Sequence, residues 1–429
     1  MPAADPTDPI ALLLAGRYPD PTTGELLRAD TRRVVIEDSL AGAEAELLSE
    51  LGLGRRLAVL SDDNTFAALG QRVERALAGT FAVQRVLLDT PFDADSETIA
   101  RLDRVIDPGT DAIVAVGSGT LNDLGKMVAF LRGIPQVVFA TAPSMNGYTS
   151  LSASITSQGV KRSVRAATPV GVFFDLRVLA AAPLPLLRAG LGDSSCRPTA
   201  QADWLLAHLL LDRPYREAPF ALLAGDEAAL FAHARELVSG DLGALRRLVR
   251  ALVLSGFGMT ICDGSYPASQ GEHLVSHYLE MQHHTVPERL HGEQIGVCAL
   301  AMARLQEQIL DRETPPPLRA STLTRAEVLA RFGPSAGETC WTEVAPKLLD
   351  PASAEKLSAR LARDWDAIRT RLAAVTLGPR VMEAVLVAAG APTTHAELGW
   401  SDSQFAEAMR HAREIRNRYT FLDLAAEAA

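Results

Sequence analysis

Up to about Asp175, short runs of β-branched residues alternate with segments of helical spacing. Buried strands are predicted for five runs, namely RRVVIED, RLAVLSD, VQRVLLD, AIVAVG and QVVFA. The segments between them, such as SLAGAEAELLSELG and LNDLGKMVAFLRG, carry apolar residues at helical intervals. Because this alternation is typical of βαβ units, it predicts a parallel sheet with helices on its faces.

The strand patterns end at about Asp175. Just before this point, SLSASITSQGVKRSVRAATPVGVFFDL contains two extended runs around Gln158-Gly159 and predicts a hairpin. Helical spacing then continues to Leu424 in segments separated by Pro, Gly and Asp. We therefore expect an α/β N-terminal domain with a parallel sheet, residues 1–180, followed by an all-helical C-terminal domain, residues 181–429.

Charge and composition exclude several classes of function. A formal net charge of −10 disfavours nucleic acid and anionic membranes, because either partner calls for a basic face. The N-terminus MPAADPTDPIALLLAGRYPD lacks the basic start of a signal peptide, and no apolar run reaches the roughly 20 residues that span a bilayer. The four cysteines form no CxxC pair and indicate reduced thiols. We expect a cytoplasmic protein that binds neither nucleic acid nor membrane.

A glycine-containing turn lies between the fourth predicted strand and the helix after it. In AIVAVGSGTLNDLGKMVAF, Gly117-Ser118-Gly119-Thr120 forms this turn. Glycines let the backbone approach a phosphate, and the first N–H groups of a helix attract anions. The turn lacks the third glycine of the usual dinucleotide fingerprint and does not follow the first strand. Phosphate binding and a purely steric turn both remain open.

Asp62 and Asp63 follow the strand RLAVLSD. An acid at this place can bind the adenosine ribose and repel a 2′-phosphate, which would favour NAD over NADP. Because Asn64 and Thr65 come next, Asp62 is also a suitable helix cap.

Five of the nine histidines lie between Gly271 and Gly296, in GEHLVSHYLEMQHHTVPERLHGEQIG. His273 and His277 are four residues apart on a helical pattern, so they share a face. His291 precedes another apolar helical segment, and the short TVPER loop is expected to bring the two helices side by side.

Two imidazoles and one carboxylate leave an open coordination position, as in catalytic zinc sites. Asp193, which follows an expected Gly190-Leu191-Gly192 turn, can supply the carboxylate. A histidine pair at this spacing is more often only the half-buried polar face of a helix. His283 and His284 are adjacent and are expected to be solvated surface residues.

Five motifs occur together between roughly Arg33 and Leu300: VGSGTLNDLGK, TAPSMNGYTS, AGLGDSSCRPTAQADW, PASQGEHLVSHYLE and LHGEQIGV. In their order and spacing they resemble the sn-glycerol-1-phosphate dehydrogenases, members of the iron-containing alcohol dehydrogenase and dehydroquinate synthase-like superfamily. The resemblance implies a dehydroquinate synthase-like fold, in which residues 1–180 form a nucleotide-binding domain with a Rossmann-like sheet and residues 181–429 form a helical domain that binds metal and substrate. We further expect a homo-oligomer.

The resemblance also implies a site. Asp193, His273 and His291 would bind a divalent metal, with Zn²⁺ favoured over Ni²⁺ or Fe²⁺, and His277 would lie beside the substrate as a catalytic proton relay. The implied NAD(P)H contacts are Asp62, Gly117, Ser118, Gly119, Thr120, Leu121, Thr141, Ala142, Pro143, Ser144 and Ser150.

The chain departs from the family pattern at two positions. Ser118 stands where the family usually has a second glycine. Asn146 stands where the family has an aspartate that touches substrate, so this catalytic position keeps its size but loses the charge of a base.

The predicted activity is metal-dependent, NAD(P)H-linked interconversion of dihydroxyacetone phosphate and sn-glycerol 1-phosphate, a small phosphorylated polyol. The metal would polarise the carbonyl for hydride transfer. Alternatives are oxidation of glycerol or another polyol, and a catalytically silent relative that binds nucleotide. A dehydroquinate synthase-type cyclase is disfavoured, because its metal carboxylate is a glutamate whereas this chain offers Asp193. The candidate cations for the substrate phosphate are Lys161, Arg162, Arg165 and Arg197.

Overall fold

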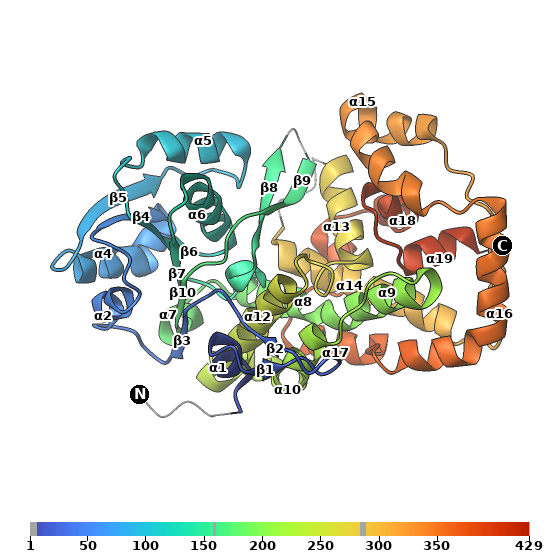
Figure 1. Cartoon of the computed structure of the whole chain (residues 1–429), viewed down its shortest axis with the longest axis horizontal. Coiled ribbons are helices and arrows are strands. Elements are labelled where there is room, and N and C mark those ends of the chain that lie inside the picture. The colour runs from blue at the N-terminus through green and yellow to red at the C-terminus, as the bar shows by residue number, and fades with distance from the viewer. Residues whose placement is uncertain (1–6, 158–159, 284–288, 429) are drawn as a thin grey trace. The chain divides into compact units, whose positions relative to one another are not determined.

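The computed structural model describes residues 7–157, 160–283 and 289–428. A six-stranded sheet is the centre of its α/β part (Figure 1), and the strand order is β3-β10-β7-β6-β4-β5. All neighbouring strands are parallel. The strands are β3 (Arg33–Glu37), β4 (Arg56–Asp62), β5 (Ala82–Leu88), β6 (Ala112–Gly117), β7 (Gln136–Ala140) and β10 (Gly171–Asp175). The predicted parallel sheet is confirmed.

Five of these strands coincide with predicted runs, and β10 is an additional one between β3 and β7. All five residues of β10 are buried, so the strand lacks the alternation that marks a half-exposed strand. The predicted hairpin is also present, as the antiparallel pair β8 (Ser152–Ser157) and β9 (Val160–Arg165). Its expected turn, Gln158-Gly159, lies outside the described residues. A smaller antiparallel pair is formed by β1 (Tyr18–Pro19) and β2 (Leu26–Leu27).

Helices cover both faces of the sheet because successive strand residues point to opposite faces. Leu57 and Val59 of β4 join a core with residues of α2 and α4, whereas Ala58 and Leu60 join a core with residues of α5 and α6. The helices and helical turns of this part are α1 (Pro9–Leu14), α2 (Glu44–Ser49), α3 (Asp63–Thr65), η1 (Phe66–Gly70), α4 (Gln71–Leu77), α5 (Ser96–Val105), α6 (Gly119–Arg132) and η2 (Gly147–Thr149).

After β10 the regular secondary structure of the described residues is helical apart from one isolated bridge, between Leu318 and Ala428. The helices are α7 (Leu176–Ala180), α8 (Leu184–Ser195), α9 (Arg197–Leu211), α10 (Ala218–Ala232), α11 (Ala234–Val238), α12 (Leu242–Ile261), α13 (Gly271–Gln282), α14 (His291–Leu310), α15 (Arg325–Val344), η3 (Ala345–Lys347), α16 (Pro351–Ala373), α17 (Pro379–Ala388), η4 (Ala396–Leu398), α18 (Asp402–His411), η5 (Ala412–Ile415) and α19 (Phe421–Glu427). The predicted helical character of the C-terminal part is confirmed.

The chain forms two compact units, and both are discontinuous in sequence. The first comprises Met1–Ser194 and Glu217–Ser265, and the second comprises Ser195–Arg216 and Tyr266–Ala429. Helix α8 up to Ser194 and helices α10 to α12 are therefore in the same unit as the sheet, whereas the expected boundary lay between residues 180 and 181. The reason is packing, because α12 lies against η2 and α7 and the Thr149 hydroxyl donates to the carbonyl oxygen of Val253 at 2.7 Å. The functions expected of residues 1–180 and 181–429 stay predictions.

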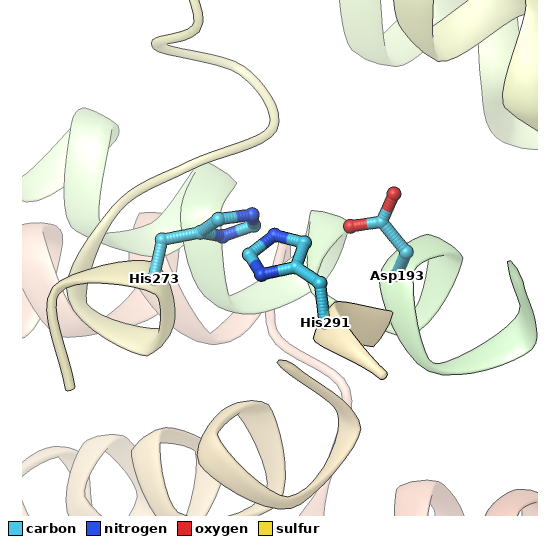
Figure 2. A group of neighbouring side chains, drawn as sticks. All are labelled: Asp193, His273 and His291. Atoms are coloured by element: carbon cyan, nitrogen blue, oxygen red, sulfur yellow. The ribbon is translucent and has the colours of Figure 1, made fainter. Parts of the chain in front are cut away.

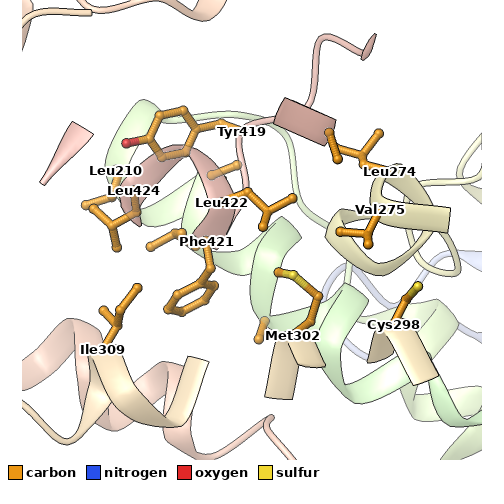
Figure 3. Close-up of a cluster of buried hydrophobic side chains, with 14 of the residues drawn as sticks. Leu210, Leu274, Val275, Cys298, Met302, Ile309, Tyr419, Phe421, Leu422 and Leu424 are labelled. Atoms are coloured by element: carbon orange, nitrogen blue, oxygen red, sulfur yellow. The ribbon is translucent and has the colours of Figure 1, made fainter. Parts of the chain in front are cut away.

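The core of the second unit includes the C-terminal helix α19. Phe421 and Leu424 are fully buried and belong to one cluster with Leu210 of α9 and with Met302 and Ile309 of α14 (Figure 3). Burying a phenylalanine or leucine side chain stabilises a fold by roughly 1.5–3 kcal/mol, so this last helix is part of the core.

No helix in the described ranges combines the length and the hydropathy needed to cross a membrane. All four cysteines lie in these ranges, and none of them forms a disulfide.

Candidate active site

The carboxyl ends of β4, β6 and β7 bring predicted cofactor residues to one edge of the sheet. These strands are neighbours; Asp62 ends β4, Gly117 ends β6, and Thr141 follows β7. The Thr141 N–H donates to the Gly117 carbonyl oxygen at 3.1 Å. The chain passes from β4 to β5 on one side and from β6 to β7 on the other, so the strand order reverses between β4 and β6. Open α/β sheets bind ligands at such a switch point.

The turn between β6 and α6 is compatible with both interpretations that the sequence left open, a purely steric turn and a phosphate-binding turn. A Cβ on Gly117 would lie 2.3 Å from Cδ1 of Leu121, so packing alone requires glycine there. A Cβ on Gly119 would meet only Met145, at 3.3 Å. The first hydrogen bond of α6 runs from the Asn122 N–H to the Ser118 carbonyl oxygen, at 2.9 Å. The N–H groups of residues 119–121 therefore have no acceptor within the helix and suit a phosphate.

Asp62 is the N-cap of α3. Its Oδ1 accepts a hydrogen bond from the Thr65 N–H at 2.7 Å, and the Thr65 hydroxyl accepts one from the Asp62 N–H at 3.0 Å. The capping interpretation is thus confirmed. Because the cap uses Oδ1 only, the ribose contact stays a compatible prediction.

The segment from Thr141 to Ser150 makes close contacts with two helices. A Cβ on Gly190 of α8 would lie 1.8 Å from the Pro143 carbonyl oxygen, and one on Gly256 of α12 would lie 2.2 Å from Oγ1 of Thr149. Ala142 and Pro143 are buried, and Ser144 is half-buried. The expected turn Gly190-Leu191-Gly192 is wrong, because these residues belong to α8, where Gly190 permits the close approach.

Lys126 of α6 binds the carboxyl end of the segment from Thr141 to Ser150 and is only 1% exposed. This lysine was not identified as a site residue from the sequence. Its ammonium donates to the carbonyl oxygens of Gly147 at 2.8 Å, Ser150 at 3.0 Å and Ser152 at 3.0 Å. Burial lowers the pKa of Lys126 to about 8. The hydroxyl of Ser150, a predicted cofactor contact, donates to the Ser152 carbonyl oxygen at 2.8 Å. A lysine inside the apolar run LNDLGKMVAFL was the signal in the sequence.

Asn146 and Asp193 are linked by a hydrogen bond. The Asn146 N–H donates to Oδ2 of Asp193 at 2.8 Å, and the two residues are 9% and 2% exposed. Among the described residues, the buried side-chain nitrogen of Asn146 has no hydrogen-bond partner. Buried donors are nearly always satisfied, so this amide is suited to meet a ligand oxygen.

Three predicted histidines lie together. His273 and His277 come from α13, and His291 is the first residue of α14. Their ring centroids are 5.2, 5.8 and 5.9 Å apart in pairs. The Ser276 hydroxyl donates to Oε1 of Gln294 at 2.8 Å and joins the two helices, so their predicted pairing is confirmed.

His283 and His284, the other two histidines of this stretch, are not part of the group of three. His283 follows the end of α13 and is half-buried rather than fully solvated, and His284 lies outside the described residues, as do residues 285–288 of the TVPER loop.

Asp193, His273 and His291 each offer one ligand atom, and these atoms all lie within 4.8 Å of one another. Figure 2 shows the three side chains pointing toward one another. One carboxylate and two imidazoles suit Zn²⁺ with an open fourth position, and imidazole also suits Ni²⁺ and Fe²⁺. The donor set therefore fits the divalent metal that the sequence predicts.

Cys196, Glu272 and His273 form a second group that meets the same distance criterion. Their polar atoms already have protein partners: Oε1 of Glu272 accepts from the Gln270 N–H at 2.7 Å and lies 3.0 Å from Nδ1 of His273. The Cys196 thiol donates to the Ala268 carbonyl oxygen at 3.6 Å. We interpret this group as a hydrogen-bonded core and not as a second metal site.

The contacts of the four basic residues that were candidates for binding the substrate phosphate do not favour any one of them. Arg165 is exposed and pairs with Asp263, and Arg197 donates to Oε1 of Gln201 at 2.6 Å. Arg162 is exposed, and the side chain of Lys161 lies outside the described part of the chain.

Comparison with known proteins assigns the family. The model of the iron-containing alcohol dehydrogenase family matches residues 35–183, from within β3 to beyond β10 of the parallel sheet. The glycerol-1-phosphate dehydrogenase [NAD(P)+] of Thermococcus kodakarensis is 32% identical over 296 residues, covering 69% of this chain and 83% of the relative. The chain belongs to the glycerol-1-phosphate dehydrogenase family. It is therefore an oxidoreductase, and the predicted family and enzyme class are confirmed.

Two further similarities extend over nearly the whole chain. The glycerol-1-phosphate dehydrogenase [NAD(P)+] of Bacillus velezensis is 28% identical over 411 residues, 92% of each protein. The solved structure of a probable glycerol dehydrogenase from Sinorhizobium meliloti is 21% identical and covers 91% of this chain and 90% of that chain, with a TM-score of 0.61. This second similarity shows the shared fold alone.

Proposed function

We propose that this chain uses NAD(P)H and a divalent metal to interconvert dihydroxyacetone phosphate and sn-glycerol 1-phosphate. The names of its relatives support glycerol 1-phosphate as one substrate and NAD(P) as the cofactor. The observation that carries the proposal is the group of Asp193, His273 and His291, with ligand atoms within 4.8 Å of one another. Zn²⁺ is the proposed metal, and Ni²⁺ and Fe²⁺ are the alternatives.

Each residue of the group has a separate task in this proposal. The metal, when bound, supplies Lewis-acid polarisation of the reacting substrate oxygen. Asp193, His273 and His291 hold it, and the backbone N–H of Asn146 orients the Asp193 carboxylate. The side-chain amide of Asn146 donates to a substrate oxygen. His277, which is 9% exposed and one helical turn from His273, transfers a proton between the substrate and solvent.

The nucleotide is proposed to bind at the carboxyl edge of β4, β6 and β7. The N–H groups that begin α6 would receive the pyrophosphate, and Asp62 would accept hydrogen bonds from the adenosine ribose. The chain's part is to hold the nicotinamide in place for hydride transfer. A cytoplasmic homo-oligomer is also proposed, and light scattering of the purified protein measures its mass.

The decisive experiment is a cofactor-coupled assay with a panel of substrates. Dihydroxyacetone phosphate, dihydroxyacetone and related phosphates are each tested with NADH and NADPH, and the product is analysed for chirality. The expected product is sn-glycerol 1-phosphate. A clear preference for unphosphorylated dihydroxyacetone would instead assign the chain to polyol oxidation.

A pair of histidine variants tests the metal. His291→Ala is expected to abolish activity without unfolding the chain, because a catalytic metal contributes less to folding than a structural one. His283→Ala removes a nearby histidine outside the group and is the matched control. Full turnover of a demonstrably metal-free sample would contradict the metal-dependent mechanism.

A further inference from the structure

Glu272 is a fully buried carboxylate next to a proposed metal ligand. Three polar groups lie around it: the Gln270 N–H at 2.7 Å from Oε1, Nδ1 of His273 at 3.0 Å from the same oxygen, and the Thr199 hydroxyl at 3.3 Å from Oε2. The Thr199 hydroxyl also lies 2.8 Å from the Cys196 carbonyl oxygen. Its contact with His273 is also within ion-pair distance. Burying a carboxylate is costly unless it is hydrogen-bonded, so its contact with a proposed metal ligand calls for a specific role.

The contact with His273 determines which ring nitrogen carries hydrogen. Oε1 of Glu272 already accepts the Gln270 N–H, so it acts as the acceptor toward His273 as well, and the hydrogen between the two residues belongs to Nδ1. A neutral imidazole with hydrogen on Nδ1 has its lone pair on Nε2. This tautomer presents Nε2 as the nitrogen that can bind a metal.

The first turn of α13 is fixed so that Glu272 cannot easily move. The Gly271 N–H donates to Oδ2 of the buried Asp203 at 2.9 Å. A Cβ on Gly271 would lie 2.5 Å from Cε of Met302 and 2.7 Å from Oδ2 of Asp203, so α13 begins in close contact with its neighbours. Thr199 reaches Glu272 from α9, which therefore holds the carboxylate from a second element.

We propose that Glu272 is a positioning residue whose carboxylate sets the tautomer and ring orientation of His273, so that Nε2 ligates the metal. This inference rests on the proposed metal site. Removing a carboxylate that accepts from a ligating histidine typically weakens metal binding by about 10- to 100-fold. Glu272 would influence the reaction only through His273.

The test measures Zn²⁺ affinity directly, without turnover. Metal-stripped, full-length protein is titrated with Zn²⁺ in competition with a chromophoric chelator, and circular dichroism checks that each variant is folded. Glu272→Met removes both oxygens and is expected to raise the Kd by about 100-fold. Glu272→Gln keeps one acceptor for Nδ1 but loses the charge, and is expected to raise the Kd by about tenfold. Glu427→Gln, a buried carboxylate of the same unit without an imidazole partner, is expected to bind like the wild type.

The outcomes separate this inference from the proposed function. A folded Glu272→Met protein with wild-type affinity overturns the positioning role. If Glu272→Met does not fold, Glu272→Gln decides, and wild-type affinity in that variant has the same consequence. His291→Ala serves as the reference: if it keeps wild-type affinity, the proposed metal site itself is wrong. If His291→Ala loses affinity while both Glu272 variants keep it, only the positioning role fails.

Discussion

The second unit should lose stability as the pH rises toward neutrality, because of Glu427 in the last helix. This residue is 1% exposed, and its carboxyl group accepts hydrogen bonds from the hydroxyls of Ser321 and Tyr419, each at 3.0 Å. Burial, followed by the nearby carboxylate of Asp423, raises the pKa of Glu427 from 4.5 to about 7. An acid with a raised pKa binds more protons in the folded state than in the unfolded state. Its stabilising contribution is therefore present below pH 4.5 and is lost as the pH rises through about 7.

The size of the effect follows from the shift. A rise from 4.5 to about 7 corresponds to roughly 3.4 kcal/mol between the acidic and alkaline limits, at about 1.4 kcal/mol per pKa unit. Between pH 5 and pH 7 the expected loss is about 2 kcal/mol. Domains are stable by only about 5–15 kcal/mol, so this loss is large enough to measure.

Glu427→Gln removes the titrating group while keeping a side chain of similar size. Urea unfolding at pH 5 and pH 7 should show the wild type losing about 2 kcal/mol more than the variant over this interval. Tryptophan fluorescence reports on the correct unit, because Trp204, Trp341, Trp365 and Trp400 all belong to the second one. Equal pH dependence of the two proteins would refute the reasoning.

Three further predictions concern the nucleotide edge and the site. Asp62→Asn keeps a good helix cap but removes the charge, so kcat/KM for NADPH should rise relative to kcat/KM for NADH while Tm stays unchanged. Asp62→Ala removes the cap and should lower the free energy of unfolding by about 1 kcal/mol. A wild-type preference for NADPH would leave Asp62 as a cap alone. Lys126→Met takes away the donor to the Ser150 carbonyl, so chemical denaturation should show a loss of roughly 1–3 kcal/mol, and the cofactor KM should rise. An unchanged unfolding free energy would speak against this role. Asn146→Asp adds a charge-assisted acceptor beside Asp193 and should raise kcat/KM for dihydroxyacetone phosphate up to roughly tenfold. No change over the substrate panel would place Asn146 outside the site.

Local patterns were enough to predict most of the sheet and the gathering of histidines. β4, β6 and β7 were recognisable because their β-branched runs are flanked by helical segments. β10 was not separated from the hairpin that precedes it, because a strand buried on both faces is a continuous apolar run. The histidines were predictable because an interval of four places His273 and His277 on one face, and a short loop leads to His291.

Contacts between distant parts of the sequence were not predictable in this way. The three carbonyl oxygens bound by Lys126 lie 21 to 26 residues further along the chain. The Thr199 hydroxyl that meets Glu272 is 73 residues away from it. A buried charge depends on such partners, and spacing within one segment does not reveal them. The division into units escaped prediction for the same reason, because α12 returns to the part of the chain that precedes it.

The interleaving of the two units has a consequence for the chain as it leaves the ribosome. Domains generally complete their folding as units, N-terminal first, but the first unit here must wait for Ser265, where its second segment ends. Helix α9 is synthesised before that point, and its residues Leu206 and Leu210 belong to a buried cluster with residues of the second unit that are made later, such as Met302 and Ile309 of α14. Until α14 is made, these leucines lack those partners. We expect a ribosome-bound chain halted just after Ser265 to recruit chaperones more strongly than one halted at Ser194.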